Sequence, residues 1–156
     1  MSKYLVKGAE IDKRPETLVQ HQFNDNAIRH TRTLTEGMGL LNLGIHIVRI
    51  EPGRDSTTHH YHEADEEFIY ILDGSGTAQI DNEEFAICAG DFMAFPTGGP
   101  AHSLHNSSDQ DLVYLVGGER NLPDIVHYPE LKRTMVKSIE GRKWSDWSDL
   151  HDLPPR

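Results

Sequence analysis

The middle of the chain consists of short apolar segments separated by turn-forming residues. The segments are Leu41–Ile50, Phe68–Leu72, Thr77–Ile80, Phe85–Cys88, Phe92–Phe95, His102–Asn106 and Leu112–Val116. Short segments rich in β-branched and aromatic residues are typical of strands. No helical period of about ten or more residues separates them, which excludes a βαβ fold. The spacing therefore predicts an all-β sandwich or barrel.

Local patterns within these segments predict finer details. The alternation of apolar residues changes parity after Ile47, at Val48, which predicts a bulge or a strand bend near Ile47. Asp81-Asn82 separates two of the segments and predicts a hairpin turn. Cys88 is the only cysteine, which excludes an intramolecular disulfide, and its apolar neighbours predict a small core residue.

Three parts follow one another along the chain. We expect an N-terminal extension at residues 1–37, the β-barrel at residues 38–120 and a C-terminal segment at residues 121–156. In the extension, Pro15 predicts the start of a short helix that runs to about Gln22.

The C-terminal segment carries weaker patterns than the barrel. We expect a loop over Asn121–Pro129 and one last strand over Thr134–Ile139. Trp144 and Trp147 stand close to the end of the chain. Because an exposed tryptophan pair would be unusual, we expect this tail to pack against the barrel or against a neighbouring subunit.

Length, net charge and the distribution of apolar residues exclude some classes of partner and location. Its 156 residues suit one domain, and 15 basic against 25 acidic residues give a net charge of −10. This balance argues against nucleic acids and anionic membranes as partners. No apolar run approaches the roughly 20 residues of a membrane span, and Met1–Tyr4 is too polar for a signal peptide. We therefore expect a cytoplasmic location.

The segment from His59 to Glu67 holds three histidines and four carboxylates. His60 and His62 are two residues apart, so both imidazoles point to the same face of an extended strand. Glu67 begins the next apolar strand at a position that the pattern reserves for the core. A buried carboxylate is costly unless a cation compensates its charge, and a metal ion is the natural compensator. His102 heads a later strand and completes a His/His/Glu/His ligand set.

The donor set restricts the metal. Three imidazoles and one carboxylate suit Fe, Mn, Co, Ni, Cu or Zn, whereas Ca and Mg prefer oxygen ligands. We expect one divalent transition metal ion, with Fe, Mn, Ni and Zn as the candidates. Around an octahedral ion these four ligands leave two positions for water or substrate, which is typical of catalytic sites.

Two stretches of the chain together resemble the two sequence motifs of the cupin superfamily. In the first motif a glycine precedes His-x-His, and a glutamate and a further glycine follow. Within Gly53–Gly74, four residues separate His62 from Glu67 and six separate Glu67 from the final glycine. The second motif looks like Gly90–Asn106, where it is carried by Gly90, Pro96, Gly98, His102 and Asn106.

Two spacings depart from the family pattern. Six residues rather than five lie between Gly53 and His60, and three rather than two lie between Gly98 and His102. Taking His59 as the first ligand would restore the first spacing but would break the His-x-His step. We therefore keep His60 and expect His59 to lie beside the site or to be exposed.

The resemblance implies a single cupin-type barrel, a double-sheet jelly roll, in a small bacterial single-domain protein of unassigned activity. It also implies a metal ion held by His60, His62, Glu67 and His102, a small-molecule ligand, and a homodimer.

Three functions remain open on this basis. The first is a metal-dependent oxygenase or isomerase that acts on a small polar metabolite, since the fold does not select the reaction. The second is a non-catalytic module that binds a sugar or an organic acid, and the third is a metal-stabilised structural subunit. For an enzyme, Tyr70 or a histidine outside the ligand set is a candidate general base.

Other polar residues lie near these motifs. We expect the following side chains to face solvent or to point away from the ligands: His46, Arg49, Tyr61, Asp65, Glu66 and His105. The patterns do not decide whether Tyr70 and Tyr114 line the pocket or cover the outside.

Overall fold

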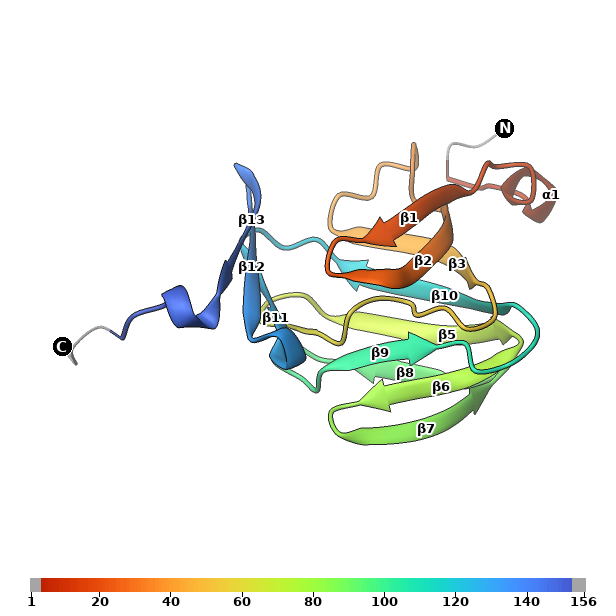
Figure 1. Cartoon of the computed structure of the whole chain (residues 1–156). Helices are drawn as coiled ribbons and strands as arrows, with labels where there is room; N and C mark the ends of the chain where they lie inside the picture. The colour runs from red at the N-terminus through yellow and green to blue at the C-terminus, as the bar shows by residue number, and fades with distance from the viewer. Residues whose placement is uncertain (1–3, 153–156) are drawn as a thin grey trace.

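The computed structural model describes residues 4–152, and it is almost entirely β-structure (Figure 1). The strands are β1 (Thr17–His21), β2 (Asn24–Thr33), β3 (Leu43–Ile50), β4 (Tyr61–His62), β5 (Glu67–Asp73), β6 (Ser75–Ile80), β7 (Glu83–Cys88), β8 (Phe92–Phe95), β9 (His102–His105), β10 (Leu112–Glu119), β11 (Asp124–Tyr128), β12 (Arg133–Ser138) and β13 (Gly141–Asp146). The helical elements are α1 (Gly8–Ile11), η1 (Pro129–Leu131) and η2 (Trp147–Asp149). Within residues 4–152, none of these helices has the length and apolar character that crossing a membrane requires.

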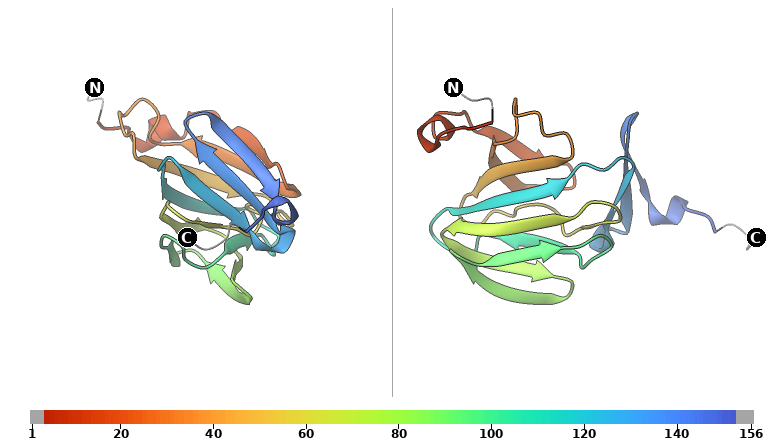
Figure 2. Two further views of the ribbon diagram at one scale, coloured as in Figure 1. Left: turned by 90° about the vertical axis from the view of Figure 1, so that its left-hand side faces the viewer. Right: turned by 180° about the vertical axis from the view of Figure 1, so that it is seen from behind.

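The strands form two layers, and a third sheet lies at one end. The larger layer has the strand order β1-β2-β3-β10-β5-β8, and the smaller has the order β7-β6-β9. The remaining sheet, β13-β12-β11-β4, stands across one end of both layers (Figure 1; Figure 2, left). The predicted all-β jelly roll is confirmed, with the predicted hairpin between β6 and β7.

Alternation along the strands places every second side chain between the two layers. On β5, Ile69 and Ile71 are buried, whereas Tyr70 and Leu72 are exposed. Burying one such aliphatic side chain contributes about 1.5–3 kcal/mol, and a slip of one residue would turn the apolar set outward. The register is therefore well determined, and Glu67 shares the parity of the buried isoleucines.

The strand β3 is regular along its whole length. It pairs with β10 without a register shift from Leu43 to Ile50, so the predicted bulge near Ile47 is wrong. Val48 and Ile50 are buried in the core, while Ile45 and Ile47 are half-buried on the other face. Both faces of β3 are at least partly covered, so both carry apolar side chains. The apolar residues therefore shift from one face to the other along the strand.

The N-terminal segment contributes strands to the larger layer. The helix predicted from Pro15 to about Gln22 is wrong, because this segment forms β1. β1 and β2 make a hairpin, and β2 pairs with β3, where Thr31 lies opposite Val48. Backbone hydrogen bonds to an existing sheet outweigh the local preference for a helix start.

The C-terminal segment holds more strand structure than predicted. β11 lies within Asn121–Pro129, which we expected to be a loop, while β12 corresponds to the predicted last strand. β11 pairs with β4, where Val126 lies opposite His62. This pairing attaches the end sheet to the predicted metal-ligand segment.

Aromatic contacts hold the tail against its own subunit, one of the two expected arrangements. Trp144 packs edge-on against Phe23, with ring centroids 5.6 Å apart, and the guanidinium of Arg133 lies 4.3 Å from the Trp144 ring. Trp147 donates a hydrogen bond from its indole nitrogen to β12 at 2.8 Å.

The predicted core position of Cys88 is wrong. Cys88 is exposed, whereas its neighbour Ile87 is buried. Strand alternation along β7 allows only one of two adjacent side chains to face the core.

Candidate functional site

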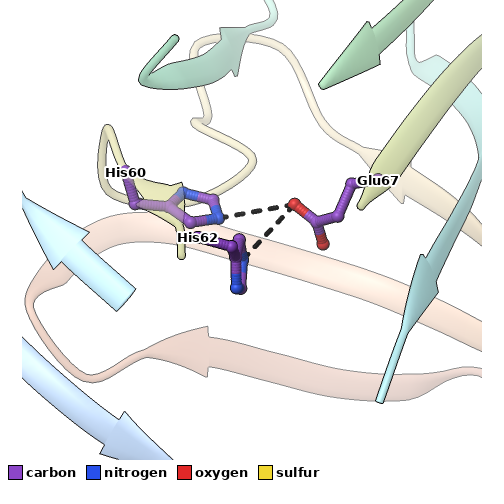
Figure 3. Close-up of side chains that lie close together, drawn as sticks. All are labelled: His60, His62 and Glu67. Atoms are coloured by element: carbon purple, nitrogen blue, oxygen red, sulfur yellow. Dashed lines mark ion pairs between the residues drawn. The ribbon is translucent and has the colours of Figure 1, made fainter. Parts of the chain in front are cut away.

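The four predicted ligands meet at the end of the layers that the β11–β13 sheet covers. His60 and His62 lie at β4, Glu67 is the first residue of β5, and His102 is the first residue of β9. His60 and His102 form an isolated β-bridge, which joins their two segments. Figure 3 shows Glu67 reaching from its own strand towards the imidazoles of His60 and His62.

The distances define a compact cluster around one carboxylate oxygen. Oε2 of Glu67 lies 3.7 Å from Nε2 of His60, 3.4 Å from Nε2 of His62 and 3.2 Å from Nε2 of His102. The ligand atoms of His60, His62 and Glu67 all lie within 4.8 Å of one another. His102 joins the cluster through its contact with Glu67 and through its ring, whose centroid is 4.8 Å from that of His60.

A hydrogen bond at Nδ1 orients each imidazole. The acceptors are Thr58 O for His60 at 2.8 Å, Asp124 Oδ2 for His62 at 2.7 Å and Pro100 O for His102 at 3.4 Å. When Nδ1–H donates to these oxygens, a neutral ring keeps its Nε2 lone pair for a metal ion, whereas a hydrogen bond from Nε2 to Glu67 requires the ring to carry a proton there as well. Such outer partners are what orient histidines that bind metal ions.

Aromatic packing fixes the plane of His102. Its ring stacks on Phe95 with centroids 3.5 Å apart and an interplanar angle of 5°. Tyr128 approaches His60 on the other side of the cluster, with ring centroids 6.0 Å apart. The cluster is therefore held by packing as well as by hydrogen bonds.

The protonation states suit a cation-binding site. Burial alone would raise the pKa of Glu67, but hydrogen bonds with His102 and His60 outweigh it and hold that pKa well below its usual range. Burial lowers the pKa of His102 despite its contact with Glu67. An ionised carboxylate and a neutral imidazole are the forms that coordinate a metal ion.

A second group of acidic residues adjoins His62. Asp124 and Asp65 are both buried, and Nζ of Lys137 lies 2.7 Å from Asp124 Oδ2 and 2.5 Å from Asp65 Oδ2. Burial would raise the pKa of Asp124, but hydrogen bonds from Lys137 and His62 lower it to about 2. The ammonium group already balances these carboxylates, so this group is an ion-pair cluster.

The positions of Asp65 and Asp124 differ from what the sequence predicted. Asp65, expected to be a solvated loop carboxylate, is only 2% exposed, because Lys137 and the backbone N–H of Asn121 bind it. Glu66 is exposed as expected. Asp124 was missed, although it begins an apolar strand just as Glu67 does, and that signal could have found it.

A pocket opens above the four predicted ligands. It has a volume of about 280 Å³ and is walled by apolar side chains that include Ile69, Val116 and Val126. A neighbouring hollow of about 570 Å³ shares Glu67 and Val116 with it. Tyr114 is buried and lines the pocket, whereas Tyr70 is 40% exposed on the outer face of β5.

Several histidines of the described residues lie outside the ligand cluster. His59 is buried beside it and contacts Ser103 Oγ at 3.4 Å. His105 is exposed as expected, and His127 stacks on Tyr61. His46 was expected to face solvent, but it lines the larger hollow, because it shares the inward parity of Val48. His21 lies in the pocket wall. Arg49, outside the site, pairs with Glu16 and Asp111.

Comparisons with known proteins place these features in a family. A family model described as Cupin domain matches residues 46–118. A crystal structure from Acidithiobacillus ferrooxidans, provisionally described as a sugar phosphate isomerase, has a TM-score of 0.94 and 35% sequence identity, and the match covers 98% of both chains. A Silicibacter pomeroyi structure, described as a sugar phosphate isomerase from a cupin superfamily, has a TM-score of 0.81 and 25% identity over 93% of this chain and 94% of that chain.

A curated relative matches a shorter stretch. An uncharacterised protein of Methanocaldococcus jannaschii is 36% identical over 66 residues, or 42% of this chain. The matched stretch spans 52% of that relative's length.

Proposed function

Because this chain belongs to the cupin superfamily, we propose that it is a metal-dependent isomerase that acts on a small phosphorylated sugar. The observation that carries the proposal is the convergence of three imidazole Nε2 atoms on the carboxylate of Glu67 beneath a pocket. The descriptions of the two similar crystal structures support the class of reaction and of substrate.

In this proposal His60, His62, Glu67 and His102 hold one divalent transition metal ion, with Fe, Mn, Ni and Zn as candidates. Three oriented imidazoles and one ionised carboxylate fit the donor preference of these ions. When bound, the ion supplies Lewis acidity to the hydroxyl and carbonyl oxygens of a sugar.

The pocket wall contributes proton-bearing groups. Burial raises the pKa of Tyr114 and of Tyr128 to about 12, so both hydroxyl groups keep their protons at neutral pH. Burial, followed by the nearby charges of Arg29 and His60, lowers the pKa of His21 to about 4. His21 Nδ1 accepts the N–H of Phe23 at 3.2 Å, so the neutral ring carries its proton on Nε2.

These positions revise the candidates for proton transfer. Tyr70 lies on the outer face of β5, away from the pocket, and is no longer a candidate. His21, a histidine outside the ligand set, takes its place as a residue that can hold a proton at Nε2 beside the substrate.

The test is interconversion of aldose and ketose phosphates by untagged protein loaded separately with Fe, Mn, Ni or Zn and followed by NMR. We expect turnover with at least one metal, its loss in His62→Gln, and its retention in the matched control His105→Gln, which changes an exposed histidine. Saturable binding without turnover would favour the alternative, a non-catalytic module that binds a sugar or an organic acid.

We also propose a homodimer. Tyr70, Leu72 and Phe92 are exposed side chains on the paired strands β5 and β8. A contiguous apolar surface of this kind is typical of a protein–protein contact. A monomeric mass in light scattering would contradict the proposal.

A further inference from the structure

Three arginines from separate elements surround the space beside the predicted ligands. Arg29 lies on β2, Arg120 follows β10 and Arg142 lies on β13. All three line the larger hollow, and Arg29 and Arg142 also line the pocket above the predicted ligands. A local concentration of positive charge in a chain with a net charge of −10 is unexpected for a solvated surface.

These arginines differ from Arg32, Arg49 and Arg133 in having no carboxylate partner. Arg32 and Arg49 pair with Glu16, and Arg133 pairs with Asp146. In the part of the chain that the structure describes, no carboxylate lies within 4.0 Å of the guanidinium of Arg29, Arg120 or Arg142. Their charge is available to a ligand.

Arg29 also has a nitrogen atom without a hydrogen-bond partner. Its Nε is buried, and among residues 4–152 it is the one buried side-chain nitrogen or oxygen atom without a hydrogen-bond partner. A buried donor without an acceptor costs about 1–3 kcal/mol. The side chain of Arg29 also lines both hollows, where an anion would meet its charge.

Arg142 lies next to another positively charged residue, and an anionic ligand would offset the repulsion between them. It lies directly opposite Lys137 in the β12–β13 pair, and like charges in such positions are destabilising. Lys137 is balanced by Asp65 and Asp124, so the uncompensated charge is that of Arg142.

The backbone makes room for Arg120. A Cβ atom at Gly44 would lie 2.8 Å from Nε of Arg120, so a larger residue there would displace the guanidinium. The absence of a side chain on β3 lets the guanidinium lie over the strand that lines the hollow.

We propose that Arg29, Arg120 and Arg142 form an anion subsite that binds the phosphoryl group of the substrate while its sugar end lies at the metal ligands. Guanidinium groups bind phosphate through paired, charge-assisted hydrogen bonds. The assignment to the substrate rests on the proposed function, whereas anion binding by these residues does not require the metal.

The experiment is calorimetric titration of inorganic phosphate into metal-free protein at low ionic strength, with acetate as the competing anion. We expect saturable phosphate binding that weakens about tenfold or more in Arg142→Gln and in Arg120→Gln, because each removes a charged hydrogen bond. The matched control is Arg54→Gln, which removes an arginine bound to Asn26 outside both hollows. The control should change phosphate affinity by less than about twofold.

Different results of this experiment test the anion subsite and the proposed isomerase function. No saturable phosphate binding, equal losses in Arg54→Gln and Arg142→Gln, or acetate binding as tight as phosphate binding would each overturn the subsite. Metal binding without phosphate binding would overturn the subsite alone. Phosphate binding that depends on Arg142, in a protein that takes up no metal, would support the subsite and overturn the proposed function. Circular dichroism of each variant confirms that it is folded.

Discussion

Two clusters share His62 but differ in what lies against their carboxylates. In the first, Asp65 and Asp124 contact the ammonium group of Lys137. In the second, Glu67 contacts three imidazoles, and no lysine or arginine of residues 4–152 lies within 4.0 Å of its carboxylate. The chain supplies a lysine to the first cluster, whereas the contacts of Glu67 in the second are with imidazoles.

The presence or absence of a lysine beside the carboxylates distinguishes an ion-pair cluster from a metal site better than the distances between ligand atoms do. By distance alone, both His60-His62-Glu67 and His62-Asp65-Asp124 could hold a metal ion. Charge balance favours the group with Glu67 as the metal site, because a bound cation there would compensate Glu67. In the group with Asp65 and Asp124 a cation would have to displace Lys137. The following predictions test this contrast.

The largest expected effect is on stability, from Lys137→Met. This substitution leaves two buried carboxylates unpaired, and breaking a buried ion pair in this way costs about 3–5 kcal/mol. Urea unfolding measures the loss. The matched control Lys143→Met removes an exposed ion pair with Glu140 and should cost less than about 1 kcal/mol. Equal losses in the two variants would show that the first cluster is not balanced by Lys137.

Glu67→Gln tests the other cluster. The amide removes the charge that a metal ion would compensate, so metal affinity should fall more than about 100-fold, a larger loss than that of an outer partner. The control Glu66→Gln changes an exposed neighbour and should keep its metal. Full metal content in purified Glu67→Gln would refute the ligand assignment.

Asp124→Asn tests the link between the clusters. The amide cannot hold the His62 imidazole as a carboxylate does, and the loss of such a partner lowers metal affinity by about tenfold. Competition with a chelator measures the change, and exposed Asp109→Asn is the control. An unchanged affinity would mean that His62 does not need its outer partner.

The smallest expected effect is a pH dependence of stability that arises from the burial of His21 in the pocket wall. His21 has its pKa lowered to about 4 by burial and by Arg29 among other neighbours, whereas an unfolded chain has the ordinary value of 6.5. The unfolded chain therefore binds more protons between these values, so stability falls as the pH decreases through 6.5 towards 4. Lowering the pH from 7 to 5.5 should cost about 1 kcal/mol, and His21→Gln should remove this component. An identical pH profile in His21→Gln would contradict the lowered pKa.

The barrel strands and the ligand cluster could be predicted because their signals are local. Alternation of apolar residues defines β5, and Glu67 stands out as a charged residue at a core parity. The spacing of His60, His62 and His102 is likewise visible in the chain itself.

The rest depends on residues that are distant in the sequence. Asp124 lies 62 residues after His62, and Lys137 lies 72 residues after Asp65, so no local pattern joins either pair. The strand β1 has no strong pattern of its own and gains its structure from pairing with β2. Arg29 and Arg142 come from opposite ends of the chain, and only the folded sheets bring them to one hollow.

The most direct test of the central claim is elemental analysis of protein purified without a metal-binding tag. We expect close to one equivalent of iron, manganese, nickel or zinc per chain in the wild type. The absence of metal, even after reconstitution with each of these ions, would contradict this expectation and would leave the cluster around Glu67 without the cation that its charge requires.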